Sequence, residues 1–196
     1  MSSGDVLLLN SDGSPLSIIP LSVVSWQEAI KLLILDKVTP IEFYSDWTVH
    51  SPTLAMQVPA IIITKKYHES ATRIRFTKQN LYWRDNGNCQ YCNKHFNIKD
   101  LTLDHVTPKS MGGRKVWENI VLSCCDCNWT RGDDISIRPN KIPRKPTYYQ
   151  LVSERRKFPI SISHESWKLF LNWPEDLVTV GSSDEEKFNI EHVIKK

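Results

Sequence analysis

Two Cys-x-x-Cys motifs constrain this sequence more than any other feature. Cys89 and Cys92 form the first motif, Cys124 and Cys127 form the second, and 31 residues separate the two. Each motif turns tightly enough to present two thiolates to one ion, and two such motifs complete a tetrahedral zinc site. One motif alone would also suit a redox site. The pair predicts a structural Zn²⁺ site, and the long spacing indicates that a segment is inserted between its two halves.

The remaining composition is that of a globular protein. The chain has 196 residues, of which 40% are apolar and 24% charged, so one domain or two small ones are expected. The longest apolar runs are far shorter than the roughly 18 residues of a membrane span. The first residues lack the basic start and apolar run of a secretory signal. We therefore expect a cytoplasmic location, where disulfides are rare, and we expect the fifth cysteine, Cys125, to be a packed bystander thiol.

The net charge of +3 is distributed unevenly along the chain. Residues 61–157 carry 19 basic and 9 acidic side chains, a net charge of +10. Residues 1–60 have a net charge of −4 and residues 158–196 of −3. A basic middle between acidic ends suits a polyanionic partner, although a solvated charged surface would give the same count.

Apolar runs and capping patterns place the motifs on secondary structure. Strands are predicted over residues 5–10, 38–44, 58–64, 101–106 and 120–122. A capping box at Ser25–Glu28 opens one helix, and Thr77 caps another that runs to Asp85. Further helices are expected over residues 125–132, 147–157 and 164–173, and the last 15 residues are expected to be loosely ordered.

The segment between the two motifs carries a second group of polar residues. Asp104 and His105 end one predicted strand, Asn119 precedes the next, and Asn128 lies on the helix that follows. A strand–loop–strand–helix clasp would bring the oxygens of Asp104 and Asn128 together. Two oxygen ligands with open positions suit a hard cation such as Mg²⁺. A neutral His105 beside that ion could take a proton from an attacking water.

These residues resemble the HNH endonucleases of the ββα-metal superfamily, in their tetracysteine zinc-bound branch and their bacterial and phage type. The resemblance is carried by the run from Arg84 to Asp134, which includes Cys-Gln-Tyr-Cys, Asp-His, Trp-Glu-Asn, Cys-Cys-Asp-Cys-Asn and Arg-Gly. Weaker similarity to one HNH subgroup extends upstream through residues 6–10, 15–16, 26–33 and 76–92.

The resemblance implies a fold and a division of the chain. We expect an α+β protein in which residues 77–146 form a ββα-metal HNH nuclease domain with a tetracysteine structural zinc site. Residues 1–76 would form a small N-terminal α+β region that packs on the nuclease core, or contacts a second copy or a phage or bacterial protein. Residues 147–196 would form C-terminal helices and a polar tail.

The resemblance also implies a role for each polar residue. Asp104 and Asn128 would bind the catalytic Mg²⁺ or Mn²⁺, and His105 would act as general base. The amide of Asn119 would hold the loop between the strands and so orient His105. Phosphates of DNA would be held by basic residues of the middle segment, namely Lys109, Arg114, Lys115, Arg131, Arg138, Lys141, Arg144 and Lys145.

The function that follows is a metal-dependent DNA endonuclease that hydrolyses phosphodiester bonds with one catalytic metal. Two alternatives remain open: a zinc-stabilised nucleic-acid-binding module without catalysis, and a nuclease directed to RNA. Trp117 and Trp129 could stack on bases, but packing against the small zinc core is the simpler expectation for both.

Overall fold

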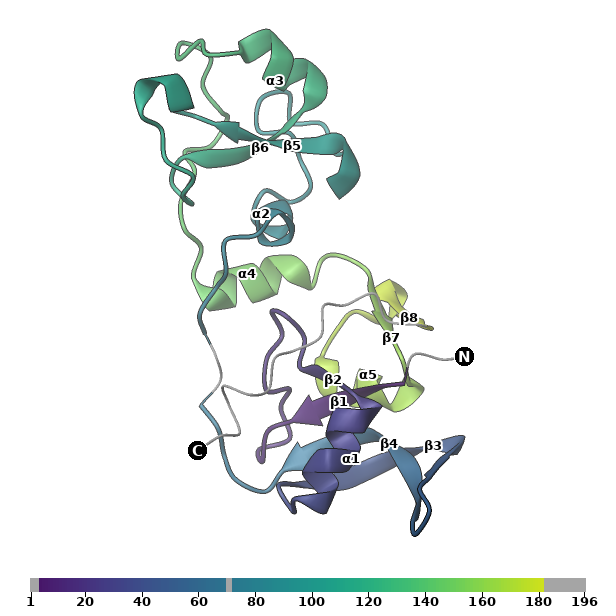
Figure 1. Cartoon of the computed structure of the whole chain (residues 1–196). Helices are drawn as coiled ribbons and strands as arrows, with labels where there is room; N and C mark the ends of the chain where they lie inside the picture. The colour runs from purple at the N-terminus through teal and green to yellow at the C-terminus, as the bar shows by residue number, and fades with distance from the viewer. Residues whose placement is uncertain (1–3, 70–71, 182–196) are drawn as a thin grey trace. The chain divides into compact units, whose positions relative to one another are not determined.

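The computed structural model describes residues 4–69 and 72–181, and these divide into two compact units (Figure 1). The first unit contains the described residues before Thr72 together with those from Pro159 onwards, and the second unit runs from Thr72 to Phe158. The polar tail predicted for the last 15 residues lies outside the described part of the chain. No helix in that part is both long and apolar enough to cross a membrane.

The first unit is built on a four-stranded sheet in the order β2-β1-β4-β3. Its strands are β1 (Asp5–Leu9), β2 (Val23–Ser25), β3 (Val38–His50) and β4 (Ala55–Thr64). Strand β1 runs parallel to β4 and antiparallel to β2, while β3 and β4 form an antiparallel pair. Strand β1, apolar after Asp5, is completely buried, as expected for a strand covered on both faces.

Helix α1 (Trp26–Ile34) packs on this sheet and begins as the sequence predicts. The Ser25 side chain accepts a hydrogen bond from the backbone nitrogen of Glu28 at 3.3 Å, which satisfies a free N–H of the first turn. The buried cluster that joins helix and sheet consists of Val6, Leu8, Leu16, Val24, Ala29, Leu32, Val38 and Ile62.

The β3–β4 hairpin is longer than the two predicted strands of 38–44 and 58–64. Both strands continue to a turn at residues 51–54, with register shifts at Pro40–Glu42, Glu42–Phe43 and Phe43–Thr48. The added residues are mostly exposed and polar. A solvated hairpin arm needs no continuous apolar face, so its residues lack the pattern from which a strand is predicted.

The C-terminal segment contributes to both units, so the extension predicted from residue 147 is divided. Helix α4 (Tyr148–Arg155) belongs to the second unit, where it packs on α2 (Lys78–Arg84). Strands β7 (Ile160–Ile162) and β8 (Val178–Val180) and helix α5 (Lys168–Leu171) belong to the first. The Trp167 indole anchors this segment by donating a hydrogen bond to the Ala60 carbonyl at 2.9 Å.

The helix predicted over residues 164–173 is broken into shorter pieces. A 3₁₀ turn at Glu165–Trp167 leads into the four-residue α5. Asn172 then adopts a left-handed conformation with φ 49°, and Pro174 follows. This combination ends a helix, because proline cannot continue it.

The second unit contains a two-stranded antiparallel sheet flanked by helices. Strands β5 (Leu101–His105) and β6 (Ile120–Cys124) pair in register, and α3 (Cys125–Arg131) follows β6 directly. Helix α3 contacts both strands, and α2 contacts β6 from the other side of the sheet (Figure 1). Thr77 caps α2 as predicted, through a hydrogen bond from the Asn80 nitrogen at 3.1 Å. The order β5, β6, α3 confirms the predicted ββα arrangement.

Candidate metal centre and active site

The four paired cysteines converge as the sequence predicts. The sulfur atoms of Cys89, Cys92, Cys124 and Cys127 all lie within 4.8 Å of one another. Tetrahedral Zn–S bonds of about 2.3 Å place sulfurs about 3.8 Å apart, so the residues present fit a zinc ion. Cys124 is the residue before α3, and the first motif is a tight turn in which the Asn93 nitrogen donates to the Cys89 carbonyl.

The four thiols of the cluster differ in acidity. Burial raises the pKa of the Cys124 and Cys127 thiols, and in Cys127 hydrogen bonds with neighbouring sulfurs raise it further. Against the opposing effect of burial, backbone hydrogen bonds lower the pKa of Cys89 to about 7. A divalent cation would have to displace the remaining thiol protons, so its binding would release protons. Cys125, in contrast, is exposed and lies outside the cluster. The expectation that Cys125 is packed is therefore wrong, because its position on α3 faces away from the metal centre.

A separate pocket brings together three of the predicted site residues. Asp104 and His105 reach it from the end of β5, and Asn128 reaches it from α3. Lys109, Ser110 and Asp133 complete its polar lining. The predicted order of strand, loop, strand and helix therefore brings the Asp104 carboxylate, the His105 imidazole and the Asn128 amide into one pocket.

The Asp104 carboxylate is held by two further side chains. Arg131 donates from Nη1 to both carboxylate oxygens, at 3.1 and 3.0 Å, and the Tyr91 hydroxyl donates to Oδ2. Asp104 is 6% exposed. An ionised carboxylate offers about four lone-pair sites, so these three hydrogen bonds leave one acceptor direction free, on Oδ1.

Arg131 is not placed to contact phosphate, which corrects its assignment to the DNA-binding set. It is 3% exposed, and its guanidinium donates to the carbonyls of His105 (2.9 Å), Val106 and Ile137 (3.2 Å) as well as to Asp104. The guanidinium also lies 5.7 Å from the centre of the Tyr91 ring. The buried carboxylate draws this cation inwards, because an unpaired charge in the interior would be costly.

His105 lines the pocket in a half-buried position. Its Nε2 atom is buried and has no hydrogen-bond partner within the described residues. Burial lowers the pKa of His105, and the nearby Lys109 and Lys115 lower it further against the opposing effect of Asp104. A lowered pKa favours the neutral imidazole, which is the state that can accept a proton.

Asn128 is oriented by a hydrogen bond across to β5. Its Nδ2 donates to the Thr102 hydroxyl at 2.7 Å. Thr102 in turn donates to the Ser123 carbonyl at 3.1 Å, so the two strands and α3 share one polar chain. With the amide nitrogen occupied, the amide oxygen of Asn128 is the atom free to bind a cation.

Asn119 lies outside the pocket and clamps the loop between the strands. Its Oδ1 accepts from the Thr107 nitrogen at 2.8 Å, and its Nδ2 donates to the carbonyls of Thr107 (3.1 Å) and Arg114 (3.0 Å). Gly113 allows this close approach, because a Cβ there would lie 1.7 Å from the Thr107 oxygen. The loop that follows His105 is thus fixed through its backbone, in the manner expected for Asn119.

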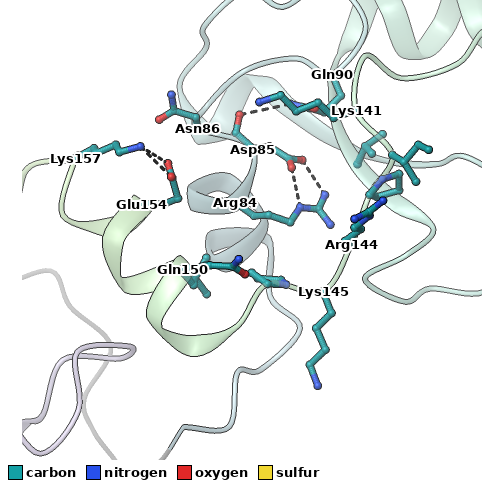
Figure 2. Close-up of a pocket in the computed structure, with 15 residues that line it drawn as sticks. Arg84, Asp85, Asn86, Gln90, Lys141, Arg144, Lys145, Gln150, Glu154 and Lys157 are labelled. Atoms are coloured by element: carbon teal, nitrogen blue, oxygen red, sulfur yellow. Dashed lines mark hydrogen bonds and ion pairs between the residues drawn. The ribbon is translucent and has the colours of Figure 1, made fainter.

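The predicted DNA-binding cations do not all line one pocket. Lys109 lines the pocket with His105. Lys141, Arg144 and Lys145 line a second, larger pocket between α2, α4 and the extended segment before α4 (Figure 2). The remaining exposed cations of the set, Arg114, Lys115 and Arg138, line neither pocket.

The second pocket also contains two ion pairs that neutralise part of its charge. Figure 2 shows Arg84 paired with Asp85 and Lys157 paired with Glu154, at 2.7 and 2.8 Å. Among the described residues no ion pair engages Lys141, Arg144 or Lys145. The pocket therefore keeps a net positive charge from these three side chains.

Sequence reasoning gives no role to the Arg84–Asp85 pair, which braces strand β6 and the residues before it. Arg84 donates to the carbonyls of Trp117 (2.9 Å) and Ile120 (2.8 Å), and Asp85 accepts from the Leu122 nitrogen at 3.0 Å. Both side chains are nearly buried. The signal in the sequence is a pair of adjacent opposite charges directly after the apolar run Leu81–Trp83, since buried charges need partners.

The two tryptophans of this unit behave differently. Trp117 is 7% exposed and packs edge-on against Phe76, with the Arg84 guanidinium 5.8 Å from its ring centre. Trp117 is therefore packed, with Phe76 and Arg84 as its neighbours. Trp129 is 88% exposed, so the same expectation is wrong for Trp129.

Comparison with known families agrees with the resemblance drawn from the sequence. Residues 89–134 match the family described as HNH endonuclease, and residues 6–71 match the HNH endonuclease-associated, N-terminal domain. No curated protein matches this chain. The chain therefore carries an HNH endonuclease domain with four cysteines positioned to hold a metal ion, preceded by an HNH endonuclease-associated N-terminal domain.

Proposed function

We propose that this protein is a metal-dependent DNA endonuclease that hydrolyses phosphodiester bonds, with His105 as general base. The observation that carries the proposal is the pocket in which Asp104, His105 and Asn128 meet. A nucleic-acid-binding module without catalysis would need the cysteine cluster and the basic surface, but it would not need these three side chains together. HNH family membership of residues 89–134 supports the same reading.

Asp104 and Asn128 are the residues that would hold a catalytic divalent cation. Each keeps one oxygen with a free acceptor direction, on a carboxylate and an amide, and such ligands suit Mg²⁺ or Mn²⁺. When bound, the cation would polarise the phosphate and stabilise the leaving 3′ oxygen. The tetrathiolate site, whose soft ligands suit zinc, would keep a structural Zn²⁺.

His105 would take the proton of the attacking water. Its lowered pKa favours the neutral imidazole, and it lines the same pocket as Asp104 and Asn128. Asn119 would act at a distance, because its three hydrogen bonds fix the backbone that follows His105. Arg131 and Tyr91 would hold the Asp104 carboxylate in one orientation.

DNA would be held through its phosphates by the exposed cations of the second unit. Lys109 lies in the pocket itself, and Lys141, Arg144 and Lys145 offer unpaired charge elsewhere on the same unit. Binding of this kind weakens steeply as salt rises, because each phosphate contact releases bound counterions.

A plasmid assay tests the proposal. Supercoiled DNA is incubated with protein loaded with zinc and freed of other metals, and then with added Mg²⁺ or Mn²⁺. We expect nicked or linear product only with the added metal, and about 10²–10⁴-fold less with His105→Ala. His50→Ala is the matched control, because His50 is exposed on β3 of the other unit.

Two results would contradict the proposal. Cleavage by folded His105→Ala at the parent rate would show that His105 is not the general base. Salt-sensitive binding without cleavage at any metal concentration would instead support the binding module. A parallel assay with RNA of equal length tests the RNA-directed alternative, which predicts faster cleavage of the RNA than of the DNA.

A further inference from the structure

Trp129 is an exposed aromatic side chain on the helix that supplies Asn128. It is 88% exposed, whereas Trp83, Trp117, Trp167 and Trp173 are each less than 9% exposed and Trp26 and Trp47 are half-buried. A tryptophan buries about 150–250 Å² of surface when it is packed. Nearly all of that area is in water, so the ring is open to a partner that arrives from outside the unit.

The side chains of α3 point in different directions around the helix, which relates Trp129 to the pocket. Arg131 points inwards to Asp104, while Asn128 and Gly132, one turn apart, line the pocket. Trp129 follows Asn128 and is therefore turned by about 100° from the pocket face. Trp129 is the chain neighbour of Asn128, about 3.8 Å away between Cα atoms, and Asn128 is the residue of α3 that would bind the catalytic metal.

The neighbours of Trp129 argue against a broad protein-binding patch on this helix. Cys125, Asp126 and Thr130 are the other exposed residues of α3, and none of them has a large apolar side chain. A lone aromatic ring beside a pocket that takes a phosphodiester fits a base better than it fits an apolar protein surface. Every base offers a flat face for stacking, independent of sequence.

We propose that Trp129 stacks on an unpaired base of the DNA strand held in the pocket, next to the phosphate that is cut. This inference rests on the proposed nuclease function and adds the form of its substrate. A base within an intact duplex has both faces covered by its neighbours, so stacking requires a single strand, a gap or an extruded base. The site therefore favours locally unpaired DNA, and Trp129 is the residue that positions it.

The first test measures binding without cleavage. His105→Ala protein with zinc bound and no added Mg²⁺ is titrated with a single-stranded oligonucleotide, and tryptophan emission is recorded. We expect quenching that is lost in His105→Ala/Trp129→Phe, because phenylalanine stacks but does not emit in this range. Affinity should fall about 5- to 150-fold in His105→Ala/Trp129→Ala and recover in the phenylalanine variant.

Trp47→Phe in the same background is the matched control. Trp47 is a half-buried tryptophan of the first unit, so its removal should leave both the quenching and the affinity unchanged. Thermal unfolding accompanies each variant. Trp129→Ala is expected to melt with the parent protein, because a fully exposed side chain contributes little to stability.

The second test measures cleavage with Mg²⁺ on two duplexes, one fully paired and one with a single unpaired base. We expect the parent protein to cut the second duplex at lower KM. Trp129→Ala should raise that KM about 5- to 150-fold with kcat within a few fold, and Trp129→Phe should restore it. Equal KM for the two duplexes, or an unchanged KM in Trp129→Ala, would overturn the inference.

Failure of this inference can be told apart from failure of the proposed function. Quenching at Trp129 without cleavage of any DNA would refute the proposed nuclease function and support the stacking contact. Cleavage by Trp129→Ala at the parent KM would refute the stacking contact and leave the proposed nuclease function standing. A change of oligomeric state in Trp129→Ala would assign the side chain to a protein contact and would also overturn the inference.

Discussion

Replacement of Arg131 by methionine is the sharpest test of the buried network behind the pocket. The Arg131 side chain is 1% exposed, and its partner carboxylate on Asp104 is 8% exposed. Methionine fills a similar volume without charge, so Arg131→Met leaves Asp104 with the single hydrogen bond from Tyr91. The carbonyls of His105 and Val106 lose their donor as well.

The expected cost is that of breaking a buried ion pair from one side, about 3–5 kcal/mol of unfolding free energy. For a unit of this size, each kcal/mol lowers the Tm by about 4–8 °C. The second unit should therefore melt at least about 12 °C below the parent. Thermal unfolding followed by circular dichroism, with zinc present throughout, measures this shift in the full-length chain.

Arg138→Met is the control for that experiment, because Arg138 is exposed and should change stability by no more than about 0.5 kcal/mol. The double variant Asp104→Asn/Arg131→Met should recover part of the loss, since both charges are then absent. A parent-like Tm for Arg131→Met, together with a shallower salt dependence of DNA binding, would refute the reasoning. That outcome would return Arg131 to the phosphate contacts.

Three other measurements test the site. Removing zinc with a chelator, or Cys89→Ser, should abolish the cooperative melting of the second unit, since metal binding there is folding energy; an unchanged melting curve would count against a structural metal. Asn119→Ala should slow cleavage, because the loop after His105 loses the hydrogen bonds that fix it, and it should cost no more than about 1–3 kcal/mol of stability. Cleavage at the parent rate in a plasmid assay would show that Asn119 does not position His105. Lys109→Ala should reduce the slope of log Kd for DNA against log salt by about 0.9. Lys168→Ala is the control, because Lys168 pairs with Glu165, and it should leave the slope unchanged. A slope for Lys109→Ala equal to that of the parent protein would exclude Lys109 as a phosphate contact.

Much of the second unit can be predicted from local sequence signals. The cysteine spacing locates the metal centre, and Thr77 and Gly132 mark the start of α2 and the end of α3. These signals act over a few residues, so they survive without knowledge of the fold. The order of strand, loop, strand and helix predicts that Asp104, His105 and Asn128 meet, and the resemblance to HNH endonucleases implies the role of each.

The features that sequence reasoning misses depend on contacts between distant residues. Arg131 is assigned to DNA because it is basic, yet its partner Asp104 lies 27 residues earlier in the chain. The sequence shows a tryptophan beside a zinc motif but does not show its exposure, because that depends on how α3 is oriented on strands β5 and β6. The same reason explains why residues 147–196 are expected to form one extension. Contacts between distant residues, such as the edge-on packing of His164 and Tyr44 and the hydrogen bond from Trp167 to Ala60, assign residues 159–181 to the first unit.

That last contact has a consequence for how the chain is made. Ala60 and Trp167 are 107 residues apart, and the whole second unit lies between them. At about 5–20 residues per second, a ribosome takes about 5–20 s to cover that distance. The second unit is one unbroken run of chain, so it emerges complete while the first unit still lacks Trp167. The nascent protein therefore contains the whole HNH domain before the sheet that precedes it in sequence receives its final anchor.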